Sequence, residues 1–382
     1  MASPFAATTP SALSDSVSDI TLFIEMPADS RARLDSYRPR VSNDDTADLL
    51  RQTFKYLPPD GRANLVEDIL QCTLDSQLHQ LGQNIVTGLL NPLKVAGGKT
   101  ATITPSPRLG VEDSIENLEA MIDDPMKRAQ KELRKKCLRR DGQMCVVSSL
   151  YNTEEEEMAP AGKMAADLEA AHVIPFDLAN FKDDAERHFI ASVWTTMYRY
   201  FPSVRSRLNF HYEDINNTAN VMMLERGIHH NFGKFRLALE PTGHPNQYKI
   251  LTFPHLAYPA RMLLPPSGLV TLVAHDGRDE LPSPILLGLH AAIAKILHAT
   301  GRGETIERLL QDYDDIAVLA RNGSTNLNDL LSVSKLPAIV QRPFNVPQPG
   351  TLSKTDEGQK VRQQSPAQVE WQKRNRLAGK EN

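Results

Sequence analysis

Two stretches in the middle of the chain decide its fold: LEAAHVIPFDLAN at residues 168–180 and INNTANVMMLERGIHHNFGKFRLALEP at residues 215–241. The first is an apolar strand that ends in His172, and Pro175 stops it. In the second, Asn220 opens another apolar segment and His229 follows nine residues later. That spacing suits a strand, a turn and the start of a helix.

A basic segment lies upstream, KKCLRRDGQMCVVSS at residues 135–149, with a turn signal at Asp141-Gly142. The order and context of the histidines and the asparagine resemble the HNH nuclease family, whose ββα-metal fold builds a single-metal phosphodiesterase site from a hairpin and a helix. The opening C-L-x-R-D-G-x-x-C-V-V, the strand L-E-A-A-H-V-I-P and the later H-x-x-F-G-K-F are similar to a fungal-type branch of that family. The resemblance runs from Cys137 to Leu239.

By position, the resemblance implies that His172 is the general base, Asn220 fixes the hairpin and His229 binds the metal. A neutral histidine suits the base role because its pKa lies near working pH. The implied cofactor is one divalent cation, Mg²⁺ ahead of Zn²⁺ or Mn²⁺. It would neutralise charge on the transferring phosphate.

The sequence departs from the family pattern at two ligand positions, which are Ala171 and Gly233 here. One protein ligand retains a divalent ion poorly, although Mg²⁺ often binds through one or two protein groups plus water and phosphate. His230 is an alternative ligand beside His229. Glu169 would point to the opposite face of a regular strand from His172, so it is not an expected ligand unless a bulge intervenes.

A dense positive cluster precedes the motif, and phosphate contact is its functional interpretation. The predicted nucleic-acid contacts are Lys131, Arg134, Lys135, Arg139 and Arg140. A solvated helix face is the alternative. The expected partner is nucleic acid, DNA ahead of RNA.

The whole chain of 382 residues has 41% hydrophobic and 24% charged residues, as soluble globular proteins do. Its net charge of −4 gives no bulk argument for nucleic-acid binding. Three cysteines indicate a reducing compartment. Without a signal peptide or a long apolar run, we expect an intracellular protein of the cytoplasm or nucleus, with no membrane partner. The oligomeric state is left open.

The predicted fold class is α+β, with an HNH ββα-metal core, a helical N-terminal region and C-terminal helices. We expect a disordered or weakly ordered N-terminus at 1–40, a helical region at 41–93, a linker at 94–112, an HNH-like nuclease domain at 113–255, a strand and helix region packing on the core at 256–340 and a disordered tail at 341–382. One C-terminal helix is marked by Ser283 and Pro284 at its start and Gly301 past its end. On it, His290 and His298 are predicted to be packed residues rather than ligands.

Two functions compete. The first is a metal-dependent endonuclease in which His172 activates water. The second is a catalytically impaired module that kept the HNH scaffold and binds nucleic acid or protein. Convergence of His172 and His229 on one cleft beside the basic helix would favour the first.

Overall fold

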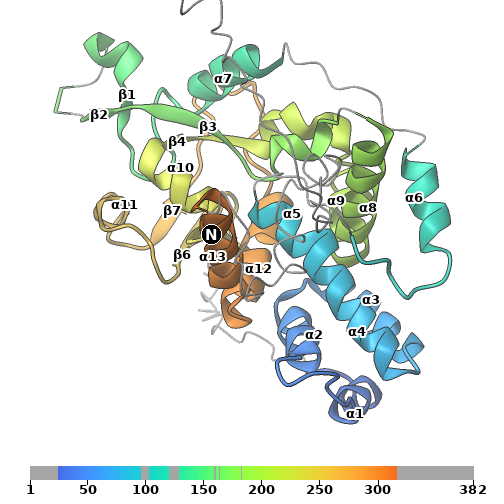
Figure 1. Cartoon of the computed structure of the whole chain (residues 1–382). Coiled ribbons are helices and arrows are strands. Elements are labelled where there is room, and N and C mark those ends of the chain that lie inside the picture. The colour runs from blue at the N-terminus through green and yellow to red at the C-terminus, as the bar shows by residue number, and fades with distance from the viewer. Residues whose placement is uncertain are drawn as a thin grey trace, which may run out of the picture. The chain divides into compact units, whose positions relative to one another are not determined.

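A computed structural model describes residues 25–95, 103–119, 129–158, 161–162, 164–181 and 183–315. Within these ranges the chain forms a mixed α+β fold of many helices and three small sheets (Figure 1). This agrees with the predicted fold class.

The hairpin at the centre of the fold joins two segments that are far apart in the sequence. Strand β3 (Leu168–His172) pairs antiparallel with β4 (Val221–Glu225) in a continuous register that puts His172 opposite Val221. The residues from Val221 to Leu224 are all buried, because both faces of β4 are covered. A strand buried on both faces reads as a continuous apolar run, which is what VMML provides.

Helix α10 (Arg226–Gly233) follows β4 directly, and Glu225 fixes where it begins. The Glu225 carboxylate accepts hydrogen bonds from the backbone N–H groups of Gly227 (2.8 Å) and Ile228 (2.9 Å). A carboxylate at this position satisfies two otherwise unpaired donors and favours the helix dipole. The strand-to-helix step therefore places His229 one turn into α10.

The N-terminal part of the chain is helical. Its helices are α1 (Ala28–Asp35), α2 (Thr46–Tyr56), α3 (Pro59–Gln71), α4 (Asp75–Ile85), the π-helical turn at Val86–Leu90 and α5 (Asn91–Lys94). On α2 the apolar residues Leu49, Leu50 and Phe54 are buried together, as their helical spacing predicts. Pro59 then begins α3 at the position where a helix tolerates proline best.

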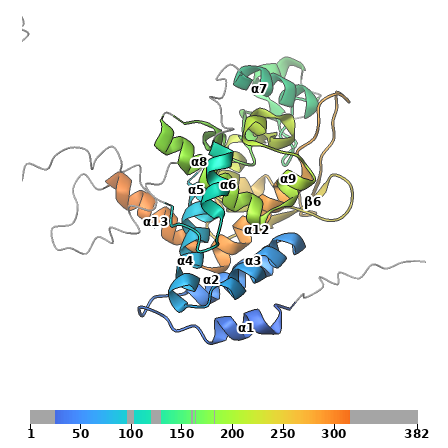
Figure 2. The same cartoon turned by 90° about the vertical axis from the view of Figure 1, so that its right-hand side faces the viewer.

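Helix α8 (Asp184–Tyr200) forms the insert between the two halves of the hairpin. Asp183 caps it by accepting from the Glu186 N–H at 2.8 Å, and Trp194 is fully buried on its inner face. Helix α6 (Val111–Glu119) lies alongside α8 (Figure 1 and Figure 2).

The C-terminal part forms an antiparallel sheet of β5 (Leu237–Pro241), β6 (Gln247–Thr252) and β7 (Leu269–Thr271). Helix α12 (Pro284–Ala299) packs on β5. The Ser283 hydroxyl accepts from the Ile285 N–H (3.2 Å), and Gly301 has a φ of 66° that turns the chain into α13 (Arg302–Asp315). The predicted helix start and stop signals are therefore confirmed.

The remaining elements are short apart from α7 (Ala129–Arg140). They are β1 (Tyr151–Asn152), β2 (Ala165–Ala166), α9 (Ser203–Ser206), α11 (Tyr258–Met262) and 3₁₀ turns at Thr153–Met158, Phe176–Ala179, Tyr212–Asn216 and Thr218–Asn220. Over the described residues, no single helix is long and apolar enough to cross a membrane. By length and composition alone, α12 and Arg302–Arg308 would pass as a bent pair.

Two segments differ from the expected boundaries. Helix α1 lies inside the N-terminus that was expected to be weakly ordered. In the expected linker, Thr104 and Pro105 pack on α4, where Asn84 donates to the Thr104 carbonyl (2.8 Å) and Gln80 to the Pro105 carbonyl (2.9 Å). Side-chain amides thus satisfy an extended backbone that lacks secondary structure. The predicted tail at 341–382 lies outside the described residues.

Candidate active site

Asn220 holds the hairpin together at the end where His172 emerges. It is fully buried, and its side chain accepts from the Ile174 N–H (2.8 Å) while donating to the carbonyls of Ile174 (3.0 Å) and Ile215 (2.9 Å). Breaking these hydrogen bonds would leave buried polar groups without partners, which lowers the free energy of unfolding. Asn220 therefore fixes the chain just after β3, and its side chain is fully used in doing so.

His172 is half-buried at the last position of β3, where Asn216 holds its ring. The His172 Nε2 lies 3.1 Å from the Asn216 Oδ1. If Nε2 carries the proton, it donates to that oxygen and Nδ1 keeps a free lone pair. Burial lowers the pKa of His172 below its usual 6.5, against the opposing effect of the Asn216 hydrogen bond. The imidazole is therefore neutral near pH 7, as a general base must be.

His229 is oriented by a carboxylate that strand alternation did not predict. The His229 Nδ1 lies 2.6 Å from the Glu169 Oε2, and Arg226 is 3.7 Å from the other carboxylate oxygen. The prediction that Glu169 is not itself a metal ligand stays a prediction, but its contact with His229 was not predicted. No bulge interrupts β3, but α10 packs against this strand, and the glutamate side chain is long enough to reach it. With Nδ1 engaged, Nε2 of His229 remains for a ligand.

His172 and His229 line one cavity of about 190 Å³, so the predicted convergence is found. The other lining residues are Leu93, Ala170, Val173, Pro175, Phe176, Phe232, Gly233, Phe235 and His290. The cavity wall is therefore mostly apolar, with imidazoles as its polar groups.

His290 brings α12 to the wall of this cavity. Its ring stacks on Phe232 and Phe235, with centroid distances of 3.8 and 4.3 Å. Its Nε2 lies 3.2 Å from the Phe232 carbonyl, and burial lowers its pKa to about 3. The predicted packed role is what the structure shows. The contact with the cavity was not predicted, because it joins residues 58 positions apart.

The basic helix α7 contacts β3 and β4 of the hairpin but does not line the cavity. Instead, Lys136 of α7 lines a separate cleft together with Asn216, the residue that holds His172, and with Arg278. The residues predicted to bind nucleic acid are largely matched by acids: Arg134 pairs with Glu154 (2.8 Å), Lys135 with Glu132 (3.3 Å), and Arg139 with Asp276 (3.1 Å) and Asp279 (2.8 Å). Lys131 is exposed.

Arg140 occupies a structural position that removes it from the set of phosphate contacts. Its side chain is fully buried and pairs with Asp141 at 2.7 Å. It also donates to the carbonyls of Thr218, Glu280 and Val221, at 2.7–2.8 Å. A guanidinium saturated in this way cannot reach a nucleic acid. The sequence shows that Arg140 is charged, but it does not show that the side chain is buried.

The donors at the cavity fit only a sparsely held metal ion. Among the described residues, no three His, Cys, Asp or Glu side chains are grouped to bind a metal. His229 can coordinate through Nε2 with Glu169 orienting it, which suits a hard ion that keeps most of its water and takes further ligands from phosphate. His230 is exposed and does not line the cavity, so it does not join His229 there.

The two positions that depart from the family pattern differ in kind. Ala171 is fully buried, so a carboxylate at that position would enter the core. Gly233 lines the cavity, and a Cβ added there would meet no atom within 4 Å. Of these two positions, only Gly233 therefore has space around it for the side chain of a second metal ligand.

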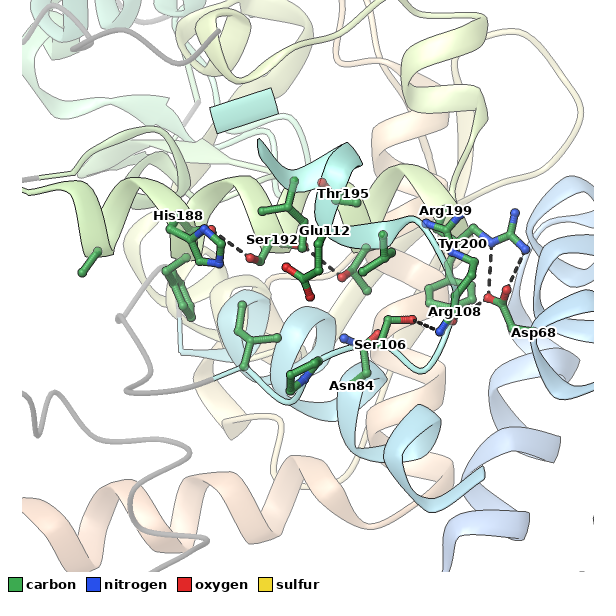
Figure 3. A pocket seen from close by; sticks show the side chains of 17 residues that line it. Asp68, Asn84, Ser106, Arg108, Glu112, His188, Ser192, Thr195, Arg199 and Tyr200 are labelled. Carbon is green, nitrogen blue, oxygen red and sulfur yellow. Dashed lines mark hydrogen bonds and ion pairs between the residues drawn. The ribbon is translucent and has the colours of Figure 1, made fainter. Parts of the chain in front are cut away.

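A larger cavity, of about 310 Å³, lies between α6, α8 and the segment before α6 (Figure 3). It shares no lining residue with the His172–His229 cavity. Figure 3 shows Arg199 turned toward Asp68, which it contacts at 2.7 Å; the Tyr200 hydroxyl donates to the same carboxylate at 3.0 Å. These groups tie α8 to α3.

Comparison with known proteins gives a family match for part of the chain. Residues 145–240 match the family model described as HNH endonuclease. No curated protein and no solved structure matches the chain. The matched region contains the hairpin, α8, α10 and both histidines of the smaller cavity.

Proposed function

We propose, from the premise that residues 145–240 form an HNH endonuclease domain, that the protein hydrolyses phosphodiester bonds of nucleic acid with His172 as the general base. The observation that carries the proposal is the meeting of His172 and His229 on one cavity, each held by its own polar partner. An unrelated domain with chance histidines would have no reason to orient both.

His172 acts by taking a proton from a water molecule through its free ring nitrogen. Asn216 keeps the ring in place, and Asn220 keeps the backbone after the ring in place. Because burial holds the pKa of His172 below 6.5, the base stays unprotonated at neutral pH. Asn216 and Asn220 therefore position the base without touching the phosphate.

His229 would hold the divalent ion through Nε2, with Glu169 fixing the ring. Nucleases of this family generally use such an ion, and Mg²⁺ is our first choice, with Zn²⁺ and Mn²⁺ as alternatives. Bound there, it would stabilise the charge that develops on the phosphate oxygens. The cavity would take one phosphate group of a DNA strand beside the imidazoles.

A second function is supported by Ala171 and Gly233. With only one histidine free to coordinate, the scaffold would retain a metal poorly. It would then serve as a module that binds nucleic acid or protein without cleaving it.

Plasmid nicking tests the proposal. The purified protein is incubated with supercoiled DNA and Mg²⁺, Mn²⁺ or Zn²⁺, beside His172→Ala and the control His244→Ala, which alters an exposed loop histidine. We expect metal-dependent nicking that falls by about 100-fold or more in His172→Ala and is unchanged in His244→Ala. Equal nicking by both variants would refute the assignment of the base. No nicking with any metal, but retention of DNA that weakens with salt, would favour the binding module.

A further inference from the structure

Three cations lie next in the sequence to residues that line the cavity of His172 and His229. Three residues that line the cavity are each followed in the sequence by a cation: Leu93 by Lys94, Gly233 by Lys234 and Phe235 by Arg236. The first comes from α5 and the other two from the end of α10 and the turn before β5.

One carboxylate forms ion pairs with two of these cations. Glu307 of α13 binds Lys94 through Oε1 (2.8 Å) and Arg236 through Oε2 (2.7 Å). The side chains of Lys94 and Glu307 are 1% and 14% exposed, so this contact is largely shielded from water. The Lys94 ammonium also donates to the Lys234 carbonyl, which ties it to the end of α10.

The charge of this cluster is not balanced. Lys94 and Arg236 share a single carboxylate, and Lys234 adds a third positive charge next to them. Two cations that hold the two oxygens of one carboxylate are also arranged to hold two oxygens of a phosphate, which is a stronger anion. Glu307 therefore occupies a site whose chemistry suits the substrate of the adjacent cavity.

The first half of α13 is attached mainly by ion pairs. Arg302 binds both oxygens of Asp45 (2.6 and 2.7 Å), and Glu304 lies 3.2 Å from the His255 ring. Between Arg302 and Arg308, the only large apolar side chain is that of Ile306, which is buried. The Arg302–Asp45 and Glu304–His255 pairs are partly exposed, and such pairs weaken with salt and compete with other charges. A polyanion can therefore loosen this half of α13, and Glu307 with it, more readily than it could displace an apolar helix.

We propose that Lys94 and Arg236 form the phosphate-binding pair of this site and that Glu307 occupies the pair until nucleic acid displaces it. The ligand is the phosphate backbone of a nucleic acid. That choice of ligand rests on the proposed function, but the pair and its resident carboxylate do not. The competing view is that the three residues only fasten α13 to the domain.

The decisive comparison is between Glu307→Gln and the control Glu116→Gln, which removes the same charge from an exposed position of α6. Binding of a short fluorescein-labelled DNA duplex is measured by anisotropy over a range of KCl concentrations, without divalent metal so that nothing is cleaved. Freeing the pair should tighten binding by Glu307→Gln about tenfold and steepen the slope of log Kd against log salt concentration by about one to two. Glu116→Gln should bind like the unaltered protein. Binding by Glu307→Gln that is no tighter than that of the control would overturn the proposal.

Hydrogen exchange of the unaltered protein gives a test that does not depend on how Glu307→Gln folds. Adding the same duplex should speed amide exchange in Arg302–Arg308, because α13 loses its anchor. Exchange that stays unchanged under saturating duplex would contradict displacement.

These results separate the inference from the proposed function. Tighter binding by Glu307→Gln, with no nicking by the unaltered protein under any metal, would support the phosphate-binding pair and refute the proposed nuclease activity. Nicking by the unaltered protein with no effect of Glu307→Gln on binding would do the reverse.

Discussion

At the residue scale, the site depends on two partners that hold two histidines. Asn216 contacts His172 and Glu169 contacts His229, and neither contact involves a neighbour in sequence. Each partner fixes which ring nitrogen is left for chemistry. The site is therefore defined by four side chains rather than by the histidines and Asn220 alone.

The pH dependence of cleavage follows from the lowered pKa of His172. A base is active when unprotonated, so activity is lost only as the pH falls through this pKa, which lies below 6.5. The Asn216 hydrogen bond raises that pKa, so Asn216→Ala should move the acid limb of kcat/KM to still lower pH. The same change should reduce the plateau by up to about 100-fold, because the ring is no longer positioned.

The measurement is a pH–rate profile of duplex cleavage for both proteins. A limb above pH 6.5 in the unaltered protein, or a limb that moves upward in Asn216→Ala, would contradict this assignment.

The open space at Gly233 predicts a gain of metal affinity. Gly233→His should fold normally, because its Cβ meets no atom within 4 Å, and it should supply a second imidazole near His229. We expect Mn²⁺ binding to tighten by about tenfold or more, as measured by isothermal titration calorimetry.

Ala171→Asp is the contrasting variant. It places a carboxylate in the core and should lower the free energy of unfolding by more than about 3 kcal/mol. The prediction for Gly233 fails if Gly233→His binds Mn²⁺ no better than the unaltered protein while its Tm is unchanged.

At the element scale, Arg140 and Asp141 join α7 to the hairpin. Arg140 reaches the carbonyls of Thr218 and Val221 at the start of β4, and the Asp141 carboxylate accepts from the Met223 N–H at 2.9 Å. Buried charges of this kind are stable only when every hydrogen bond is made. The pair therefore sets how α7 lies against β4.

Removing one member of this pair should destabilise the protein strongly. Arg140→Ala leaves the Asp141 charge buried without a partner, and we expect the free energy of unfolding to fall by about 3–5 kcal/mol. Denaturant unfolding followed by circular dichroism provides the value. Arg139→Ala, which alters the exposed neighbour, should leave the unfolding midpoint nearly unchanged. If Arg140→Ala unfolded at the same denaturant concentration as Arg139→Ala, the structural role assigned to Arg140 would be wrong.

At the scale of the whole molecule, the sequence predicted the structural features that depend on residues close to one another in the chain. His172 at a strand end, Asn220 before a second strand and His229 on a helix could be inferred because strand and helix periods determine them. The helix from Pro284 to Ala299 could be inferred from its end signals. These features involve residues that are close in sequence or that belong to a recognisable family pattern.

What could not be predicted depends on contacts between distant segments. Charge density on α7 suggested phosphate contacts, but Arg139 is matched by Asp276, which lies 137 positions away. Alternation made Glu169 an unexpected ligand, and it gave no sign that α10 packs close enough for Glu169 to reach His229. No local signal predicts that His290 lines the cavity or that Glu307 pairs with Lys94 and Arg236.

The dependence of the site on α7 and α12 limits how the protein can be divided. Arg140 and Asp141 precede the region 145–240 and brace β4, whereas His290 follows that region and backs the cavity. A recombinant fragment cut at residues 145 and 240 would expose the apolar surface of β5 that α12 covers. Such a fragment should aggregate, and limited proteolysis should release no stable piece of that size. A fragment made for crystallisation, or for transfer of this site to another protein, therefore has to begin before α7 and continue through α12.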